Sequence, residues 1–541
     1  MRSRWFVLVM PAALLPLHGC ASHGSDQGSS DPPDASVDAL RVTTTLPNSE
    51  SARAITRSLR SRFVRMPRPS PSLLALDPAV QAALEPPLPV LPAGIASRFE
   101  RVDLGLRPVI PERPGKPSLA CEARVILPER ADGEVRITDD KSGMQIGFVL
   151  ERASSREIGV ADGLAVYDRG GPFESAIIHR PHFEGTEDFV VFESRPPVEE
   201  LSYLVDVSQV PGLRLVADSL EFLDEAGSPT LRIAPPYVAG SDGETVAAHL
   251  AVEGCRYDTN PAAPWNREVV APGASRCTVK VSWKDVKYPA VVDPAWTTTG
   301  SMGTARRQHT ASLLSTNDVL VAGGVNTSGA AVATAALFHP LTAKWAATGP
   351  MAVARYDHAA VVLSDNRVLV SGGRNPTVLA STERYLPSTG VWSGAGVHKT
   401  ARARHTVTFT STGFMLAAGG TSGTTPINTI ERSADTLGTG AWSNVATLIT
   451  PRHSHTATRV ASTITVFAGG YGASSPLAAV ESLAEGDSPE ARDALTYARY
   501  DHVAWFSDAL YVAGGFPSLT AKTERLSSLT STRSEERRVG K

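Results

Sequence analysis

The sequence has few aromatic residues, few cysteines and almost no net charge. Aromatics make up 6% of the 541 residues, there are four cysteines, and the formal net charge is -3. A balanced charge gives no electrostatic support for nucleic-acid binding. No internal apolar run approaches the roughly 20 residues that a membrane-spanning helix needs. The cysteine spacings match no zinc motif, so neither a metal nor a cofactor is expected.

Glycine and proline, by contrast, are plentiful, at 44 and 40 residues. This composition favours many short strands joined by turns, and therefore an all-β fold. The length allows two or three domains.

The N-terminus has the pattern of an export signal. Two arginines precede an apolar stretch at residues 5–17, so residues 1–19 are predicted to be a signal peptide. The sequence Leu-His-Gly-Cys at residues 17–20 resembles the bacterial lipobox, although His18 stands where that pattern has a small or aliphatic residue. The resemblance implies a lipid on Cys20 and, because no Asp follows it, attachment to the outer membrane. An ordinary secretory signal cut nearby is the alternative.

The three remaining cysteines allow more than one disulfide. In an exported protein Cys255 and Cys277 could pair across a modest loop, which would stabilise the domain by about 3 kcal/mol. Cys121 is then unpaired, or it pairs with one of these two instead. The sequence leaves the connectivity open.

Residues 20–115 have the composition of a tether. The stretch up to residue 49 is rich in Ser, Asp, Gly and Pro, and residues 67–115 are studded with proline. We expect a flexible segment followed by a semi-rigid spacer. Residues 50–64 could form a short basic helix; a solvated linker helix is expected, with a helix lying on the envelope surface as the alternative.

Residues 116–293 alternate apolar and polar side chains over short stretches. Turn residues interrupt these stretches about every ten positions, as in residues 134–138 and 278–283. This texture predicts a β-sandwich-like domain, interpreted as a packing and spacing module.

Residues 294–532 are repetitive. The motif Arg-x-x-His recurs five times with its histidines 49, 47, 50 and 47 residues apart, and a glycine pair follows each. The repeated positions are Arg306, His309, Gly323, Gly324, Arg355, His358, Gly372, Gly373, Arg402, His405, Gly419, Gly420, Arg452, His455, Gly469, Gly470, Arg499, His502, Gly514 and Gly515. This period, with a Trp closing several units, resembles the Kelch repeat. The resemblance implies a β-propeller whose blades are four-stranded sheets.

Residues that recur in every repeat are expected to be scaffold contacts, because active sites break symmetry. No catalytic or metal-binding residue is therefore assigned among them. An acidic residue, expected to pair with the arginine or to cap a turn, recurs at Glu383, Glu431, Glu481 and Glu524; the first repeat has Ala336 instead. The repeats contain no cysteine, which argues against a copper-radical enzyme of the galactose oxidase type.

Both ends of the repeat array suggest a larger ring. Trp296 matches the position of a blade-closing strand, so it is expected to complete the last blade. Residues 533–541 bear no likeness to a repeat and resemble a translated sequencing adapter, with a genuine charged tail as the alternative. On this interpretation the natural protein is longer and has at least six blades.

The repeats specify a fold more than a function. The leading hypothesis is an envelope-anchored binding or scaffolding module for a protein or a glycan. The alternative is a carbohydrate-active enzyme at the propeller axis, for which Arg374, Tyr471 and Phe516 are the candidates. A purely structural surface protein is the third possibility.

Overall fold

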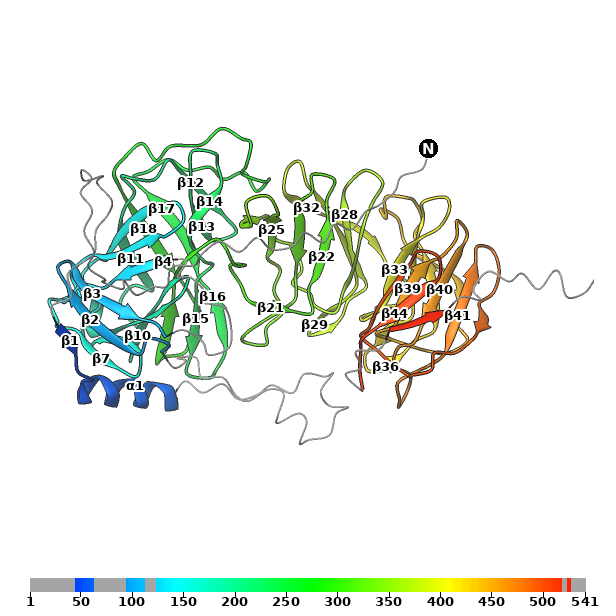
Figure 1. Cartoon of the computed structure of the whole chain (residues 1–541), viewed down its shortest axis with the longest axis horizontal. Coiled ribbons are helices and arrows are strands. Elements are labelled where there is room, and N and C mark those ends of the chain that lie inside the picture. Colours follow the sequence, from blue (N-terminus) through cyan, green and yellow to red (C-terminus); the bar gives the residue numbers. More distant parts are fainter. Residues whose placement is uncertain (1–43, 63–93, 112–122, 518–522, 527–541) are drawn as a thin grey trace, which may run out of the picture.

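The computed structural model describes residues 44–62, 94–111, 123–517 and 523–526. Within this part of the chain the fold is all-β, as predicted, with one α-helix, α1 (Glu50–Arg62), and one 3-10 turn at Pro172–Glu174. Figure 1 shows two regions: a pair of large sheets at one end, and a row of smaller sheets that leads away from it. None of the described helices is long and apolar enough to span a bilayer.

The first region is a sandwich of two sheets around one apolar core. The smaller sheet has the order β17-β18-β11-β6-β5-β4. Its strands are β4 (Ala123–Ile126), β5 (Val135–Asp139), β6 (Gln145–Leu150), β11 (Glu200–Asp206), β17 (His249–Glu253) and β18 (Arg276–Ser282). Every second side chain of β5, β11 and β18 is buried, as expected for strands covered on one face.

The larger sheet has eleven strands. Eight follow the order β12-β13-β14-β20-β10-β19-β15-β16, and β9, β8 and β7 extend it from β10. The strands are β7 (Gly159–Ala161), β8 (Leu164–Tyr167), β9 (Ala176–His182), β10 (Gly185–Phe192), β12 (Gly212–Val216), β13 (Ser219–Leu223), β14 (Pro229–Ile233), β15 (Tyr237–Gly240), β16 (Thr245–Ala247), β19 (Ala290–Asp293) and β20 (Ala295–Thr298).

Trp296 belongs to this sandwich, and the expectation that it closes the last blade is wrong. It lies on β20, opposite Thr186 of β10 and Ile233 of β14. Its ring is fully buried and stacks on Phe148 with centroids 3.8 Å apart. A Trp in an extended segment fits a sandwich core as well as the wedge between blades, so the local sequence did not distinguish the two positions.

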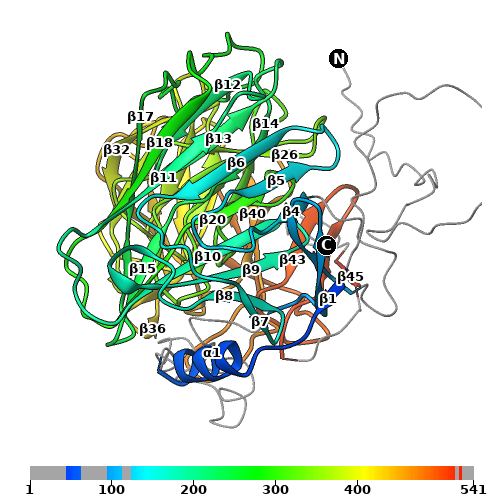
Figure 2. The same ribbon diagram turned by 90° about the vertical axis from the view of Figure 1, so that its left-hand side faces the viewer.

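Part of the predicted tether also belongs to the sandwich. Strands β1 (Thr44–Leu46), β2 (Arg98–Val102) and β3 (Gly105–Val109) form a three-stranded sheet. Helix α1 packs along β7 and β8 (Figure 2). The expectation of a solvated helix was wrong, because Ala52, Thr56 and Leu59 are buried. These positions recur at helical spacing and form one stripe.

The second region contains five repeats, four of which form four-stranded antiparallel sheets and the last of which has three described strands. In order they are β22 (Thr310–Leu313), β23 (Val319–Ala322), β25 (Ala335–His339) and β26 (Lys344–Thr348); β27 (Ala359–Val362), β28 (Val368–Ser371), β31 (Ser381–Leu386) and β32 (Val391–Val397); β33 (Thr406–Phe409), β34 (Met415–Ala418), β37 (Thr429–Arg432) and β38 (Ser443–Thr447); β39 (Thr456–Arg459), β40 (Ile464–Ala468), β41 (Val480–Ala484) and β42 (Glu490–Arg492); and β43 (Val503–Phe506), β44 (Leu510–Ala513) and β45 (Thr523–Leu526).

The first strands of successive repeats contact one another, β22 with β27, β27 with β33, β33 with β39 and β39 with β43. The repeats are thus arranged side by side and contact one another through their first strands. Short two-stranded ladders extend one face of the first three repeats. They are β21 (Arg306–Arg307) with β24 (Val325–Asn326), β29 (Arg374–Asn375) with β30 (Thr377–Val378), and β35 (Thr421–Ser422) with β36 (Thr425–Pro426). In Figure 1 this face is the lower edge of the repeats.

Candidate functional site

Successive repeats are joined at the glycine pair. The N–H of the second glycine donates to the carbonyl of the next motif arginine, as from Gly324 to Arg355 at 2.8 Å. At Gly323 the φ angle is +65°, and a Cβ would lie 2.5 Å from the Arg355 carbonyl oxygen and 2.8 Å from His358 Cε1. A side chain has no room there. The glycine pair and the Arg-x-x-His motif are therefore two halves of one contact between repeats.

The arginine side chains of repeats 2–4 are completely buried beneath this contact. In the second repeat, Arg355 Nη1 donates to the Gly372 carbonyl at 2.7 Å and Nη2 donates to Glu383 at 2.7 Å. The Glu383 carboxylate also accepts the backbone N–H groups of Ala352 and Val353, at 2.7 and 3.1 Å. The acidic side chain thus pairs with the arginine and also holds the turn in front of it.

The motif histidines of repeats 2–5 are buried and neutral at pH 7, whereas His309 of the first repeat is exposed. His358 Nε2 lies 2.9 Å from the Thr310 hydroxyl of the preceding repeat. Burial lowers the pKa of His358 to about 3 and that of His502 to about 4. An imidazole bound to a scaffold hydroxyl and neutral at pH 7 contributes to packing between repeats and has no substrate within reach.

The two middle residues of each Arg-x-x-His motif have different surroundings. The second one has a positive φ, and its N–H donates to the carbonyl at the same position of the preceding repeat, with distances of 2.8–3.2 Å. The first one is bridged to the residue after a glycine pair, as Tyr356 is to Arg374. We call these positions the mouth surface: Arg307, Gln308, Val325, Tyr356, Asp357, Arg374, Ala403, Arg404, Thr421, His453, Ser454, Tyr471, Tyr500, Asp501 and Phe516.

One end of the mouth surface is charged. Asp357 accepts hydrogen bonds from Gln308 Nε2 at 2.7 Å and from Arg404 Nε at 2.9 Å, and Arg374 Nε lies 3.8 Å from it. The side chain of Arg404 is 20% exposed and that of Asp357 is 8% exposed. With Arg307 and Asp501, whose charges act on the same groups, three guanidinium groups face two carboxylates. This end is therefore positively charged, with Arg404 accessible to solvent.

The other end of the mouth surface is aromatic. The rings of His453 and Tyr471, of Tyr471 and Tyr500, and of Tyr500 and Phe516 have centroids 5.5, 5.2 and 5.7 Å apart. Phe516 is 46% exposed. Burial, together with Arg404 and Arg374, lowers the pKa of His453 to about 4. The four rings therefore form a continuous uncharged platform beside the arginines.

The sequence named only part of this surface. Arg374, Tyr471 and Phe516, which follow glycine pairs, all lie on it. The middle residues of Arg-x-x-His were not predicted, because they vary between repeats and only recurring residues were used to define the motif. The signal that finds them is variation between two invariant positions: Arg-Gln, Tyr-Asp, Ala-Arg, His-Ser and Tyr-Asp in the five repeats.

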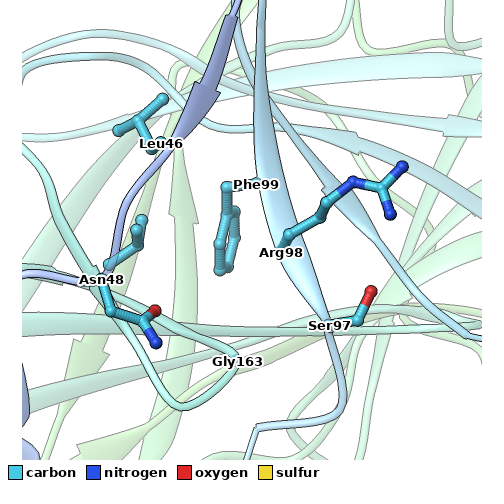
Figure 3. Close-up of a pocket in the computed structure, with 7 residues that line it drawn as sticks. Leu46, Asn48, Ser97, Arg98, Phe99 and Gly163 are labelled. Carbon is cyan, nitrogen blue, oxygen red and sulfur yellow. The ribbon is translucent and has the colours of Figure 1, made fainter.

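A hollow with a volume of about 160 Å³ lies in the sandwich, apart from the mouth surface. It is lined by Leu46, Asn48, Ser97, Arg98, Phe99, Val160 and Gly163. Figure 3 shows the Phe99 ring near its centre and the Arg98 guanidinium directed away. That guanidinium pairs with Glu100 at 2.9 Å, so the hollow presents no charged group and is a gap where the three-stranded sheet meets the β7–β8 turn.

The remaining candidates are the cysteines and possible metal sites. Cys255 and Cys277 form a disulfide bond with their Cα atoms 5.5 Å apart. Cys20 and Cys121 lie outside the described residues, as does the 533–541 segment. Within the described ranges no three His, Cys, Asp or Glu side chains are placed to hold a metal ion.

Residues 355–395 match the Kelch motif. The matched segment runs from the arginine of the second repeat through β32, so the Kelch repeat type predicted from the spacing is confirmed. The solved structure of YjhT is similar with a TM-score of 0.36 and 17% identity, over 43% of this chain and 83% of that one. No curated protein matches the chain. The chain thus contains a Kelch motif, and its all-β fold is consistent with a β-propeller; the number of blades stays a prediction.

Proposed function

We propose that this protein is a binding module and that its partner, a protein, contacts the mouth surface. One observation carries the proposal: between the motif arginine and histidine, which are the same in all five repeats, the two middle residues form four different pairs that lie on one face. They provide exposed aromatic rings beside Arg404. Tyrosine, other large aromatics and arginine dominate binding energy at protein interfaces, and Kelch repeats are typical of protein-binding propellers.

A glycan is the second possible partner, since aromatic platforms also suit sugar rings. An enzyme at the same place would need a free carboxylate or base. Asp357 is instead held by Gln308 and Arg404, and the pKa of His453 is about 4. Asp501 is exposed, and its side chain is hydrogen-bonded to Ser454. The geometry supports binding better than turnover.

Site-specific photocrosslinking in the producing cell tests this proposal. A benzophenone side chain at Phe516 should give a discrete adduct, whose digestion by protease or glycosidase identifies its class. The matched control is the same side chain at Val445, which is 45% exposed on the last strand of its sheet. An equal adduct at both positions, or none at Phe516, would overturn the proposal.

We also propose that the module is anchored to the cell envelope through a lipid on Cys20. The support is the export signal and the lipobox-like sequence before that residue. A Cys20→Ser variant should leave the membrane fraction and appear in the soluble fraction. If it stays in the membrane fraction, the lipid anchor is wrong, whereas the binding proposal is unaffected.

A further inference from the structure

The first repeat lacks the glutamate that the later repeats use. Strand register aligns Ala336, opposite Val321, with Glu383, opposite Val370, and with Glu481, opposite Phe467. Each glutamate in repeats 2–5 accepts the same three kinds of donor: Nη2 of the motif arginine and the backbone N–H groups two and three residues before it.

The donors of that carboxylate are nevertheless present in the first repeat. Arg306 keeps the scaffold bonds, with Nη1 donating to the carbonyls of Gly323 and Thr334 at 3.0 and 2.6 Å. Its Nη2 has only the Thr334 hydroxyl, at 2.9 Å. The backbone N–H groups two and three residues before it belong to Thr304 and Gly303, and neither donates to any described residue. The two backbone donors therefore have no acceptor among the described residues, and Arg306 Nη2 has a hydroxyl in place of the carboxylate.

A pocket lies where the carboxylate would be. Its lining includes Gly303, Thr304, Arg306, Ala336 and Arg232, and it leaves about 30 Å³ for the centres of water-sized molecules. A single water needs roughly 10–15 Å³ on this measure. The space therefore suits a group of two or three heavy atoms, such as a formate ion.

The sandwich adds a second buried cation to this pocket. Arg232 is 3% exposed, and it donates only to neutral oxygens: the Thr297 hydroxyl and the carbonyls of Thr298 and Ser301. None of the described carboxylates forms an ion pair with Arg232 or Arg306. Burial lowers the pKa of each guanidinium to about 10. The charges of Glu221 and Glu184 act on Arg232 without reversing this shift, and no described carboxylate acts on Arg306.

The nearby acidic side chains are occupied by other partners. Glu221 accepts from Arg214 and from the Ala347 N–H. Glu184 accepts from the Ser301 hydroxyl at 2.6 Å. Neither carboxylate is available to fill the pocket without giving up these bonds.

We propose that the pocket between Arg232 and Arg306 binds a small carboxylate anion of formate size, which takes the place of the missing glutamate. The anion joins the sandwich to the first repeat, because it accepts from Arg232 on one side and from Arg306, Gly303 and Thr304 on the other. This site is separate from the mouth surface and does not depend on the proposed function.

Thermal unfolding of the full chain in sodium formate, at constant ionic strength with gluconate as the bulky counter-anion, tests the proposal. Saturating formate should raise the melting temperature by about 2–4 °C. Ala336→Glu supplies the carboxylate within the chain, so it should show the raised melting temperature without formate and no further response. Ala336→Gln is the matched control, which fills the pocket without charge and should show neither effect.

A second variant keeps the proposal testable if Ala336→Glu does not fold. Arg232→Gln should weaken the formate response at least tenfold in half-saturating concentration. An unchanged response in Arg232→Gln, or a full formate response in a folded Ala336→Glu, would overturn the proposal. A response to chloride with none to formate would exclude a carboxylate as the ligand.

Discussion

The first repeat and the three that follow it have the same four-stranded sheet but differ in the partner of their motif arginine. In repeats 2–4 a glutamate on the third strand pairs with the arginine, as Glu431 does with Arg402 at 2.6 Å. In the first repeat Ala336 stands at that position, and the neighbour is the sandwich, which contributes Arg232. The repeat that differs is therefore the one whose surroundings differ.

The recurring arginine and glutamate compensate each other's charge inside the repeat. A buried guanidinium costs several kcal/mol unless a carboxylate and carbonyls compensate it, so the arginine and the glutamate have to occur together. At Glu431 burial opposes ionisation, but His398 and Arg402 outweigh it and hold the pKa at about 2. Where the pairing is absent, either a ligand compensates the charge or stability is lost.

Lowering the pH should have the largest effect on the stability of the repeats. The folded pKa values of His358 and His502, about 3 and about 4, lie below the unfolded value of 6.5. Between these values the unfolded chain binds more protons, so the histidines' contribution is complete above pH 6.5 and is lost as the pH falls toward 4. Urea unfolding between pH 7 and 4.5 measures this slope.

The first repeat provides the control for acid sensitivity. Partial burial and Arg306 lower the pKa of His309 as well, but this side chain is exposed whereas His358 is buried. His309→Gln should therefore reduce the pH slope less than His358→Gln, which should reduce it by up to one proton. Equal slopes in the two variants would contradict the assignment of His358 as a buried neutral contact.

Removing a glutamate from a later repeat should have the next largest effect. Glu481→Gln leaves Arg452 buried without its carboxylate partner, and a loss of about 3–5 kcal/mol in the free energy of unfolding is expected. Glu490→Gln, at an ion pair with Arg492 that is largely exposed on the acidic side, should cost less than about 1 kcal/mol. Similar urea midpoints for the two variants would refute the difference.

Removing the arginine itself should separate the first repeat from the second. Arg355→Met leaves Glu383 as an unpaired buried charge, at a cost of about 3–5 kcal/mol. Arg306→Met loses only bonds to carbonyls and a hydroxyl, at a cost of about 1–3 kcal/mol. Chemical denaturation in formate-free buffer measures both. An Arg306→Met loss as large as that of Arg355→Met would show that the first repeat has a carboxylate partner after all.

The smallest effect on stability is expected at the hydroxyl partner of His405, which lies on a different strand from the hydroxyl partners of the other buried motif histidines. His358, His455 and His502 each contact a threonine on the first strand of the preceding repeat. His405 contacts Ser371 on the second strand at 2.9 Å, where the paired first-strand residue is Ala359. Ser371 Oγ also lies 2.6 Å from His398 Nε2, so Ser371→Ala should cost about 1–2 kcal/mol, and adding Ala359→Thr should recover the part that is due to His405. Differential scanning calorimetry of the single and double variants would reject the exchange if the double variant were no more stable than the single.

Prediction from the sequence succeeded where a pattern recurred. The spacing of Arg-x-x-His and the glycine pairs identified the repeats; the structure shows them as successive sheets, and the second matches the Kelch motif. Prediction was wrong at Trp296, because one aromatic residue in an extended segment does not say which sheet it joins. At residues 50–64 the predicted helix is observed over residues 50–62, but the expectation that it is solvated was wrong, because a helix of mixed polarity reveals its buried side only when the opposing surface is known.

The sequence by itself determined the repeat period, the all-β class and the residues that recur, because steric demands at glycine and charge compensation at arginine act over short distances. Only the tertiary structure decided that Trp296 packs on Phe148 and that Tyr471 and Phe516 lie on one surface with Arg404. It also decided that Arg232 and Arg306 line one pocket. These contacts join residues from different repeats or different domains. Their geometry depends on how whole sheets pack, which no local pattern records.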